Sequence, residues 1–166
     1  MQILQSLQKI LLGTVIFLTG ALATSSVAEL GEAKQHLAGK KDCQFFSPAE
    51  WGDSLVTWHG QCQGGKAHGL GVLRAYRKEA NTLLFLGTLE QGELSLGVID
   101  GVEGYIAGQF AQGKLLPEVE RNVIISAFRN ASAAAKAYSQ RLKQSGNVRS
   151  AEFYLKKAQE LERQMD

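Results

Sequence analysis

Glycines recur five residues apart in the middle of the chain, and this spacing constrains the fold more than any other feature of the sequence. Three segments show it, namely residues 58–65, 85–92 and 105–113. In each segment an apolar residue follows the first glycine by two positions, and an aromatic residue precedes that glycine by two or three. A period of two residues is typical of a β-strand, and the second glycine marks the turn that ends it. Each segment therefore predicts a β-hairpin.

The strand that returns after each turn also carries glycines, although the three units are not equal. The first unit continues with Gly69 and Gly71, whereas the second has only Gly97. The third runs into Pro117, so we expect it to be a half-repeat that ends the sheet. These glycines permit left-handed turns and a close approach of backbones. The repeat glycines that we single out are Gly60, Gly65, Gly69, Gly71, Gly87, Gly92, Gly108 and Gly113.

Two motifs in the first unit, Trp58-x-Gly60 and Gly65-Lys66-Ala-His-Gly69-Leu-Gly71, carry a resemblance to MORN repeats. It covers residues 55–116 and implies short glycine-rich hairpins that stack into a curved sheet. In such sheets aromatic residues line one face, which implies that Trp58, Phe85 and Tyr105 share a face. We favour a core position for these rings, because hydrophobic residues at strand spacing usually become buried. The alternative is a groove in which the three aromatic residues bind a ligand.

The sequence contains two cysteines, Cys43 and Cys62. In an exported chain such a pair predicts a structural disulfide that closes a loop of about twenty residues. The alternatives are a metal site, which needs two further ligands at short spacing, and a pair of free thiols. With the disulfide in place, we expect residues 42–51 to supply a strand that caps the first hairpin.

The N-terminal residues predict export. The apolar run over residues 10–23 is too short to cross a membrane comfortably and resembles the core of a signal peptide. Small residues at Ser26 and Ala28 suit cleavage before Glu29, and a second cleavage option lies before Thr24. The alternative is that the segment is retained as an anchor.

The C-terminal third changes period. Apolar residues at positions 124, 128, 131, 135, 138 and 142 alternate steps of four and three, which predicts an amphipathic helix. Residues 145–147 interrupt it, and a second apolar stripe follows at positions 151, 154, 155, 158, 161 and 165. The prediction is an antiparallel helical hairpin, and residues 132–161 resemble one tetratricopeptide-type unit. Because one helical pair cannot bury both of its faces, it is expected to pack on the sheet, on a second copy or on a partner.

Charge is uneven along the chain. Between Arg121 and Lys157 there are eight cations and one acid, although the whole chain has a net charge of only +2. The low net charge does not favour nucleic acid as a partner. The local excess is most simply a solvated helix face, and the alternative is a basic face that binds anionic lipid or an acidic partner. The candidate basic residues are Arg141, Lys143, Lys156 and Lys157.

Motifs of catalysis, metal binding or phosphate binding do not occur in the sequence, so we expect no enzyme, no cofactor and no catalytic or metal-ligating residues. The expected fold class is α+β, with a short antiparallel MORN-type sheet followed by a C-terminal helical hairpin. The expected ranges are a signal peptide over 1–28, a linker over 29–41, the repeat domain over 42–116 and the helical hairpin over 117–166.

These features predict an exported, periplasmic or secreted, non-enzymatic binding or scaffold protein. The sheet and the helical hairpin would each offer a surface to a protein partner. The alternative is an envelope-associated binder of anionic lipid or glycan, which would use the basic helices and the aromatic residues of the sheet.

Overall fold

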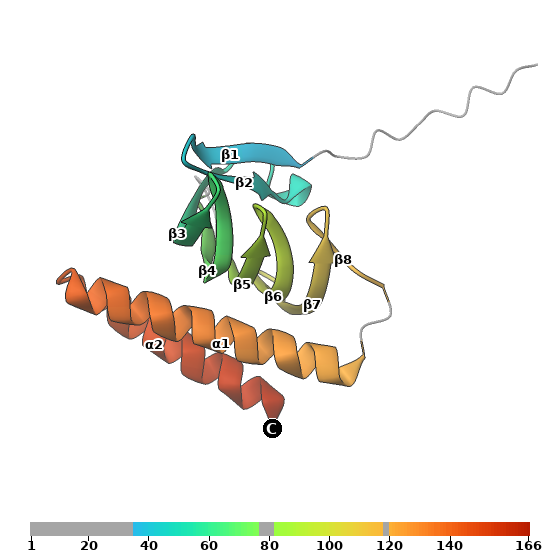
Figure 1. Cartoon of the computed structure of the whole chain (residues 1–166). Coiled ribbons are helices and arrows are strands. Elements are labelled where there is room, and N and C mark those ends of the chain that lie inside the picture. The colour runs from blue at the N-terminus through green and yellow to red at the C-terminus, as the bar shows by residue number, and fades with distance from the viewer. Residues whose placement is uncertain (1–34, 77–81, 118–119) are drawn as a thin grey trace, which may run out of the picture. The chain divides into compact units, whose positions relative to one another are not determined.

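Eight strands precede two helices in this computed structural model, which describes residues 35–76, 82–117 and 120–166 (Figure 1). The expectation of an α+β chain in which the helices follow the sheet is confirmed. The predicted signal peptide lies outside the described residues. The strands are β1 His36–Lys40, β2 Cys43–Ser47, β3 Leu55–Gln63, β4 Lys66–Tyr76, β5 Leu83–Glu90, β6 Glu93–Gly101, β7 Gly104–Ala111 and β8 Lys114–Leu115. The helices are α1 Arg121–Gln144 and α2 Val148–Glu162, with short 3-10 turns at Ala49–Trp51 and Arg163–Met165.

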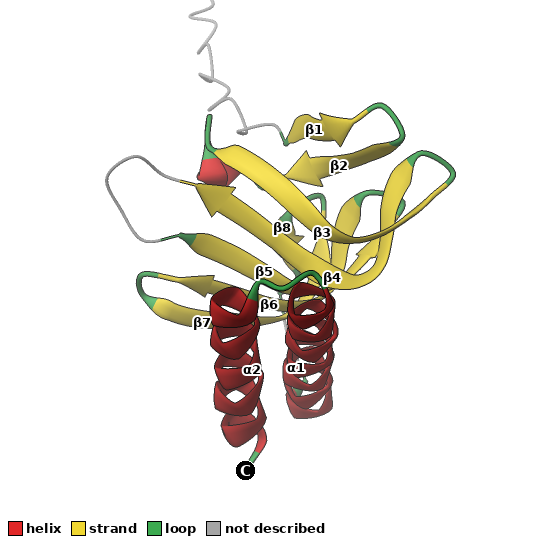
Figure 2. Cartoon of the chain, turned by 90° about the vertical axis from the view of Figure 1, so that its left-hand side faces the viewer, coloured by secondary structure: helices red, strands yellow, loops and turns green. Residues whose placement is uncertain are grey.

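The sheet is antiparallel apart from one contact. Its strand order is β1-β2-β4-β5-β6-β7-β8, with β3 paired to β4 outside this path. The single parallel pairing joins Gln44 of β2 to Lys66 of β4. Strands β1 and β2 form a hairpin, which we call the N-terminal hairpin, and it lies next to β3 at one end of the sheet (Figure 2). Strand β1 falls within the range that we expected to be a linker. Its five residues show no repeat spacing that would predict a strand. They form one because they pair with β2.

A row of glycines crosses the middle of the sheet. Gly71 lies opposite Gly87, Gly87 opposite Gly97, and Gly97 opposite Gly108. The Phe85 ring, two residues before Gly87, and the Trp58 ring, two residues before Gly60, occupy the space above these glycines, because residues i and i+2 of a strand point to the same face. A Cβ atom at Gly71 would lie 2.7 Å from Cζ2 of Trp58, and one at Gly97 would lie 2.8 Å from Cζ of Phe85. Gly71, Gly87 and Gly97 therefore leave no room for a Cβ atom.

The third unit breaks this pattern. Tyr105 precedes Gly108 by three residues, so its side chain points to the opposite face from Trp58 and Phe85. There it meets Phe128 of α1 edge to face, with ring centroids 5.9 Å apart. The expectation that the three aromatic residues share one face is therefore wrong. Ile106, two residues before Gly108, occupies the position at which the other two units have an aromatic residue.

Both faces of the sheet are buried, and each face has its own hydrophobic core. One core joins the sheet to the two helices, and the other fills the concave side under the N-terminal hairpin. The helix-side core consists of Val72, Leu84, Leu86, Val98, Ala127, Phe128, Ala131, Ala134, Ala135, Tyr154, Ala158 and Leu161. The concave-side core consists of Phe45, Trp51, Val56, Ala67, Leu73, Ala75, Leu83, Phe85, Leu89, Leu94 and Phe110.

The two helices form the predicted hairpin, which packs on the sheet (Figures 1 and 2). Buried alanines bring α1 close to the strands, and the Nδ2 atom of Asn130 donates a hydrogen bond to Oγ1 of Thr88 at 3.0 Å. Gly146, at a φ of 79°, ends α1, and the side chain of Asn147 caps α2. On the predicted stripe of the second helix, Tyr154 is buried as expected, whereas Leu155 is exposed. In the described part of the chain, neither helix has the length and apolar character to cross a membrane.

The glycine row makes a prediction that two glycines of the same strand can test. Replacing Gly97 by alanine is expected to lower the free energy of unfolding by about 1–3 kcal/mol, because the added methyl group overlaps both the carbonyl oxygen of Leu86 on the neighbouring strand and the Phe85 ring. Replacing Gly101 by alanine is the control, since the nearest atom to its Cβ, Cδ2 of Leu83, is 3.5 Å away. Urea unfolding of both variants measures the difference. Equal effects would contradict the close packing of Phe85 on Gly97.

Candidate functional site

An open groove of about 610 Å³ lies between the N-terminal hairpin and β3. We call it the hairpin groove. Strand β3 supplies one wall, and β1, β2 and the turn between them supply the other. Its lining residues are Gly39, Lys40, Asp42, Cys43, Phe45, Leu55, Val56, Thr57, Trp58, His59, Gly60 and Cys62. The groove therefore combines apolar residues with a few polar and charged ones.

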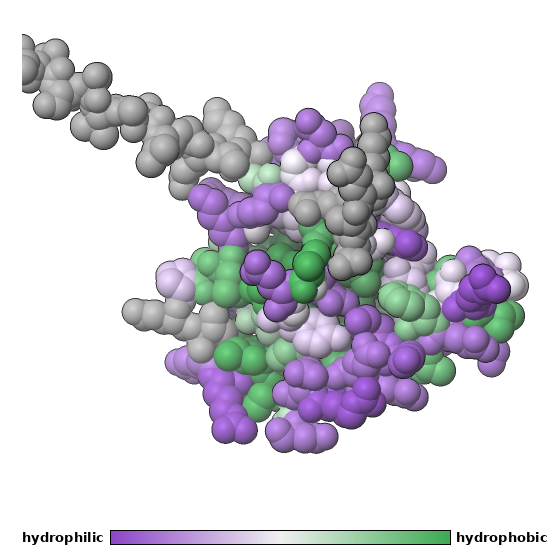
Figure 3. Space-filling view, turned by 180° about the vertical axis from the view of Figure 1, so that it is seen from behind, coloured by the Kyte–Doolittle hydropathy of each residue, from purple (hydrophilic) through white to green (hydrophobic). Residues whose placement is uncertain are grey.

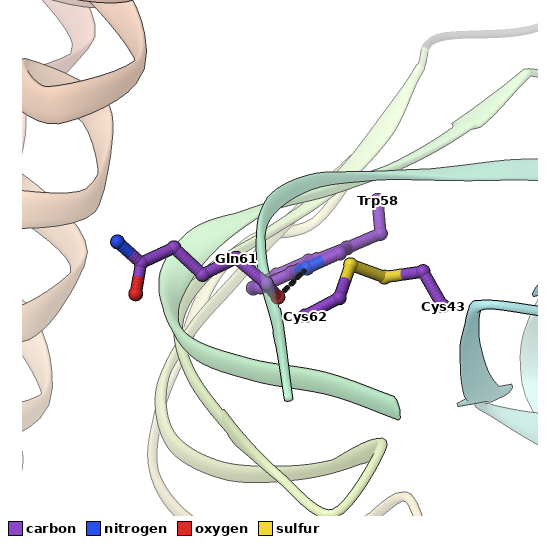
Figure 4. The surroundings of a disulfide bond; sticks show 4 residues. All are labelled: Cys43, Trp58, Gln61 and Cys62. Atoms are coloured by element: carbon purple, nitrogen blue, oxygen red, sulfur yellow. Dashed lines mark hydrogen bonds between the residues drawn. A yellow bond between two sulfur atoms is a disulfide. The ribbon is translucent and has the colours of Figure 1, made fainter. Parts of the chain in front are cut away.

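The disulfide predicted from the two cysteines is present and holds the groove together. It joins Cys43 of β2 to Cys62 of β3, with the Cα atoms 5.4 Å apart. The Trp58 ring lies beside it (Figure 4). The Nε1 atom of Trp58 donates a hydrogen bond to the carbonyl oxygen of Gln61 at 2.9 Å. These contacts fix one wall of the groove.

Strand β3 offers an unpaired edge. Among the described strands it pairs only with β4, so its other edge is left without a partner strand. Leu55, at the start of β3, is 69% exposed, whereas Val56 and Phe45 are buried in the concave-side core. A free strand edge beside apolar side chains is the feature to which extended peptides add as a further strand.

His59 links the groove to the helices. Its ring stacks on Tyr138 of α1 at a centroid distance of 4.6 Å, and its Nε2 atom lies 3.1 Å from Oγ1 of Thr57. Burial, together with the positive charges of Arg74 and Arg141, lowers the pKa of His59 below its usual value. The imidazole is therefore neutral near pH 7 and adds no charge to the groove.

The four candidate basic residues do not form one free face. Lys143 and Lys156 are exposed, but Nη2 of Arg141 donates to the carbonyl oxygen of His59 at 2.9 Å. Lys157 lies inward, because a step of one residue along a helix turns the side chain by roughly 100° from that of Lys156. Sequence spacing alone could not show that Arg141 contacts β3 or that Lys157 lies inward.

Lys157 makes a compact ion-pair cluster. Its Nζ atom lies 2.9 Å from Oδ2 of Asp100, 3.0 Å from Oε2 of Glu160 and 3.3 Å from the hydroxyl oxygen of Tyr105. Burial alone lowers the pKa of Lys157, but the hydrogen bonds to Asp100 and Glu160 outweigh it and raise the pKa above its usual value. Lys157 therefore stays charged and ties α2 to β6 and β7.

Of the three candidate aromatic residues, only Trp58 reaches the groove. Phe85 is fully buried in the concave-side core, and Tyr105 packs between the sheet and the helices. The structure does not bring the three together as a ligand groove. Sequence reasoning also missed Leu55 and Lys40, because their place in the groove depends on the N-terminal hairpin lying beside β3.

No family model, curated protein or solved structure matches the chain. The resemblances to MORN and tetratricopeptide units therefore stay predictions. In the ranges that the structure describes, no three His, Cys, Asp or Glu side chains lie close enough together to hold a metal ion.

The disulfide makes a testable contribution to stability. Reducing it is expected to lower the free energy of unfolding by about 3 kcal/mol, the value of the chain-entropy model for a loop of about twenty residues. Thermal unfolding with and without a reductant measures the effect. The control is the double variant Cys43→Ser, Cys62→Ser, whose melting temperature should not respond to the reductant. An unchanged melting temperature for the reduced native protein would contradict a structural role for the bridge.

Proposed function

We propose that this chain is an exported, non-enzymatic binding protein whose hairpin groove takes an extended segment of a protein partner. The observation that carries the proposal is the edge of β3 that pairs with no other described strand, with Leu55 exposed at its start and the Trp58 ring held on the other face of the strand. A partner segment would add its backbone hydrogen bonds along β3 and place its side chains alternately on the two faces, some near Leu55 and others near Trp58.

The groove is suited to this task because it is preorganised. The disulfide fixes the distance between its walls, and the hydrogen bond of Trp58 fixes the ring that lies inside it. A rigid groove loses little conformational entropy on binding, so more of the interaction energy appears as affinity. Lys40 and Asp42 at the N-terminal hairpin would set the register of polar groups on the partner.

Export is supported by the disulfide, since such bonds persist in oxidising compartments. The signal peptide expected over residues 1–28 belongs to the same proposal. A scaffold role for the helical hairpin has support in the apolar residues that α2 leaves at the surface. These residues are Val148, Phe153 and Leu155. Seen from behind, the surface shows hydrophobic residues exposed among hydrophilic ones (Figure 3).

The alternative function, binding of anionic lipid or glycan, would depend on Arg141, Lys143, Lys156 and Lys157. It has less support, because Lys157 is held by two carboxylates and Arg141 contacts the backbone of β3. Two of the four side chains would have to give up these contacts to meet an anionic surface.

Two apolar residues of similar exposure test the proposed site. Leu55 is 69% exposed in the groove, and Val102 is 65% exposed in the turn between β6 and β7, outside the groove. Leu55→Asp is expected to abolish capture of a protein partner from an envelope extract, because a charged side chain in the groove would lose its hydration against the apolar residues of the partner. Val102→Asp is expected to leave capture unchanged. Quantitative mass spectrometry of the captured proteins and lipids provides the measurement.

Equal capture by both variants would remove the groove from the proposal. Capture of anionic lipid without protein, lost at high salt, would favour the alternative function instead.

A further inference from the structure

A second cavity, of about 290 Å³, lies on the helix side of the sheet and shares no residue with the hairpin groove. Strands β4, β5 and β6 and helix α2 contribute to it. We call it the Arg74 cavity. Its lining residues are Arg74, Thr82, Leu84, Asp100, Phe153 and Tyr154. Such a volume is at the lower end of the range for small-molecule sites.

Two polar groups at this cavity are incompletely satisfied. Tyr154 is only 2% exposed, and its hydroxyl group interacts with Arg74 but makes no hydrogen bond of good geometry within the described structure. The Nε atom of Arg74 is also buried and lacks a hydrogen-bond partner there. Buried donors without acceptors are rare in native proteins, since each of them has lost its water without gaining a substitute. The two donors line the same cavity, where one acceptor would satisfy both.

Among the described residues that line the cavity, the charge without an ion pair is positive. Arg74 makes no ion pair with any described residue, and its guanidinium group lies over the ring of Tyr76 at 4.5 Å from the centroid. The acid in the lining, Asp100, is already paired with Lys157 at 2.9 Å. Burial is the main reason that the pKa of Tyr154 rises to about 12, so the hydroxyl keeps its proton and remains a donor.

The other walls are apolar. Leu84 belongs to the helix-side core, and Phe153 packs edge to face on Tyr154 with ring centroids 5.0 Å apart. Phe153 is 51% exposed, so the cavity has an apolar side that reaches the surface. With a liquid-water volume of about 30 Å³ per molecule, the space suits a ligand of about ten non-hydrogen atoms.

We propose that the Arg74 cavity binds a small organic carboxylate, whose oxygen atoms accept hydrogen bonds from Arg74 and Tyr154 while its apolar part lies between Leu84 and Phe153. The planar guanidinium fork matches the two oxygens of a carboxylate, which favours this class of anion. The proposal is independent of the hairpin groove.

The experiment measures binding of benzoate, phenylacetate and propionate to the purified protein by NMR titration and by thermal unfolding. At millimolar concentration at least one of these carboxylates is expected to bind saturably and raise the melting temperature. Benzamide, which has the shape of benzoate without its charge, is expected to have no such effect. Inorganic phosphate provides a second comparison, and tighter binding of phosphate than of every carboxylate would overturn the assignment.

Variants separate binding from folding. Tyr154→Phe keeps the ring and removes the hydroxyl group, so carboxylate binding is expected to weaken at least tenfold without a lower melting temperature of the free protein. Arg74→Gln is expected to abolish binding. Tyr138→Phe is the matched control, since Tyr138 contacts Tyr154 but does not line the cavity, and it is expected to leave the affinity unchanged.

Two results would overturn the proposal. One is the absence of saturable binding by all three carboxylates. The other is a Tyr154→Phe variant that melts at a lower temperature and binds as well as the native protein, because the hydroxyl group would then have a structural role only. The Leu55→Asp variant should bind the carboxylate normally, so failure of one site does not imply failure of the other.

Discussion

The packing of Trp58 and Phe85 against glycines of their own and neighbouring strands is the contact on which the other features depend. Any side chain larger than hydrogen at Gly71 or Gly97 would displace a ring or a backbone carbonyl group. Glycines at such positions allow a sheet to curve. Here the concave side of the curved sheet encloses the concave-side core. The N-terminal hairpin covers that core, and the hairpin groove lies where the two meet.

Two further ties, one covalent and one polar, connect the groove to its surroundings. The bridge between Cys43 and Cys62 joins β3 to the N-terminal hairpin, and the hydrogen bond from Arg141 to the carbonyl oxygen of His59 joins β3 to α1. The groove wall is therefore held from both faces of the sheet. A binding surface fixed in this way needs little rearrangement, which accords with the proposed addition of a partner segment to the edge of β3.

The sequence predicted what local periodicity and simple counting determine: the hairpins, the helical pair and the disulfide. Tyr105 was misplaced because an offset of three residues from Gly108 was treated as equivalent to an offset of two, although strand geometry makes them opposite. Lys157 and the Arg74 cavity could not be predicted, because they bring α2 to strands more than fifty residues earlier in the chain. Strand β1 depends in the same way on a partner, β2, that stabilises it.

The most direct test of the account is the NMR spectrum of the glycine row. Aromatic rings shift the resonances of protons that lie over their faces, and close protons also show nuclear Overhauser effects. The account predicts upfield-shifted Hα resonances for Gly60 and Gly71 with Overhauser effects to the Trp58 ring, and for Gly87 and Gly97 with effects to the Phe85 ring. Ordinary Hα shifts without contacts to either ring would contradict the claim that these aromatic residues organise the sheet.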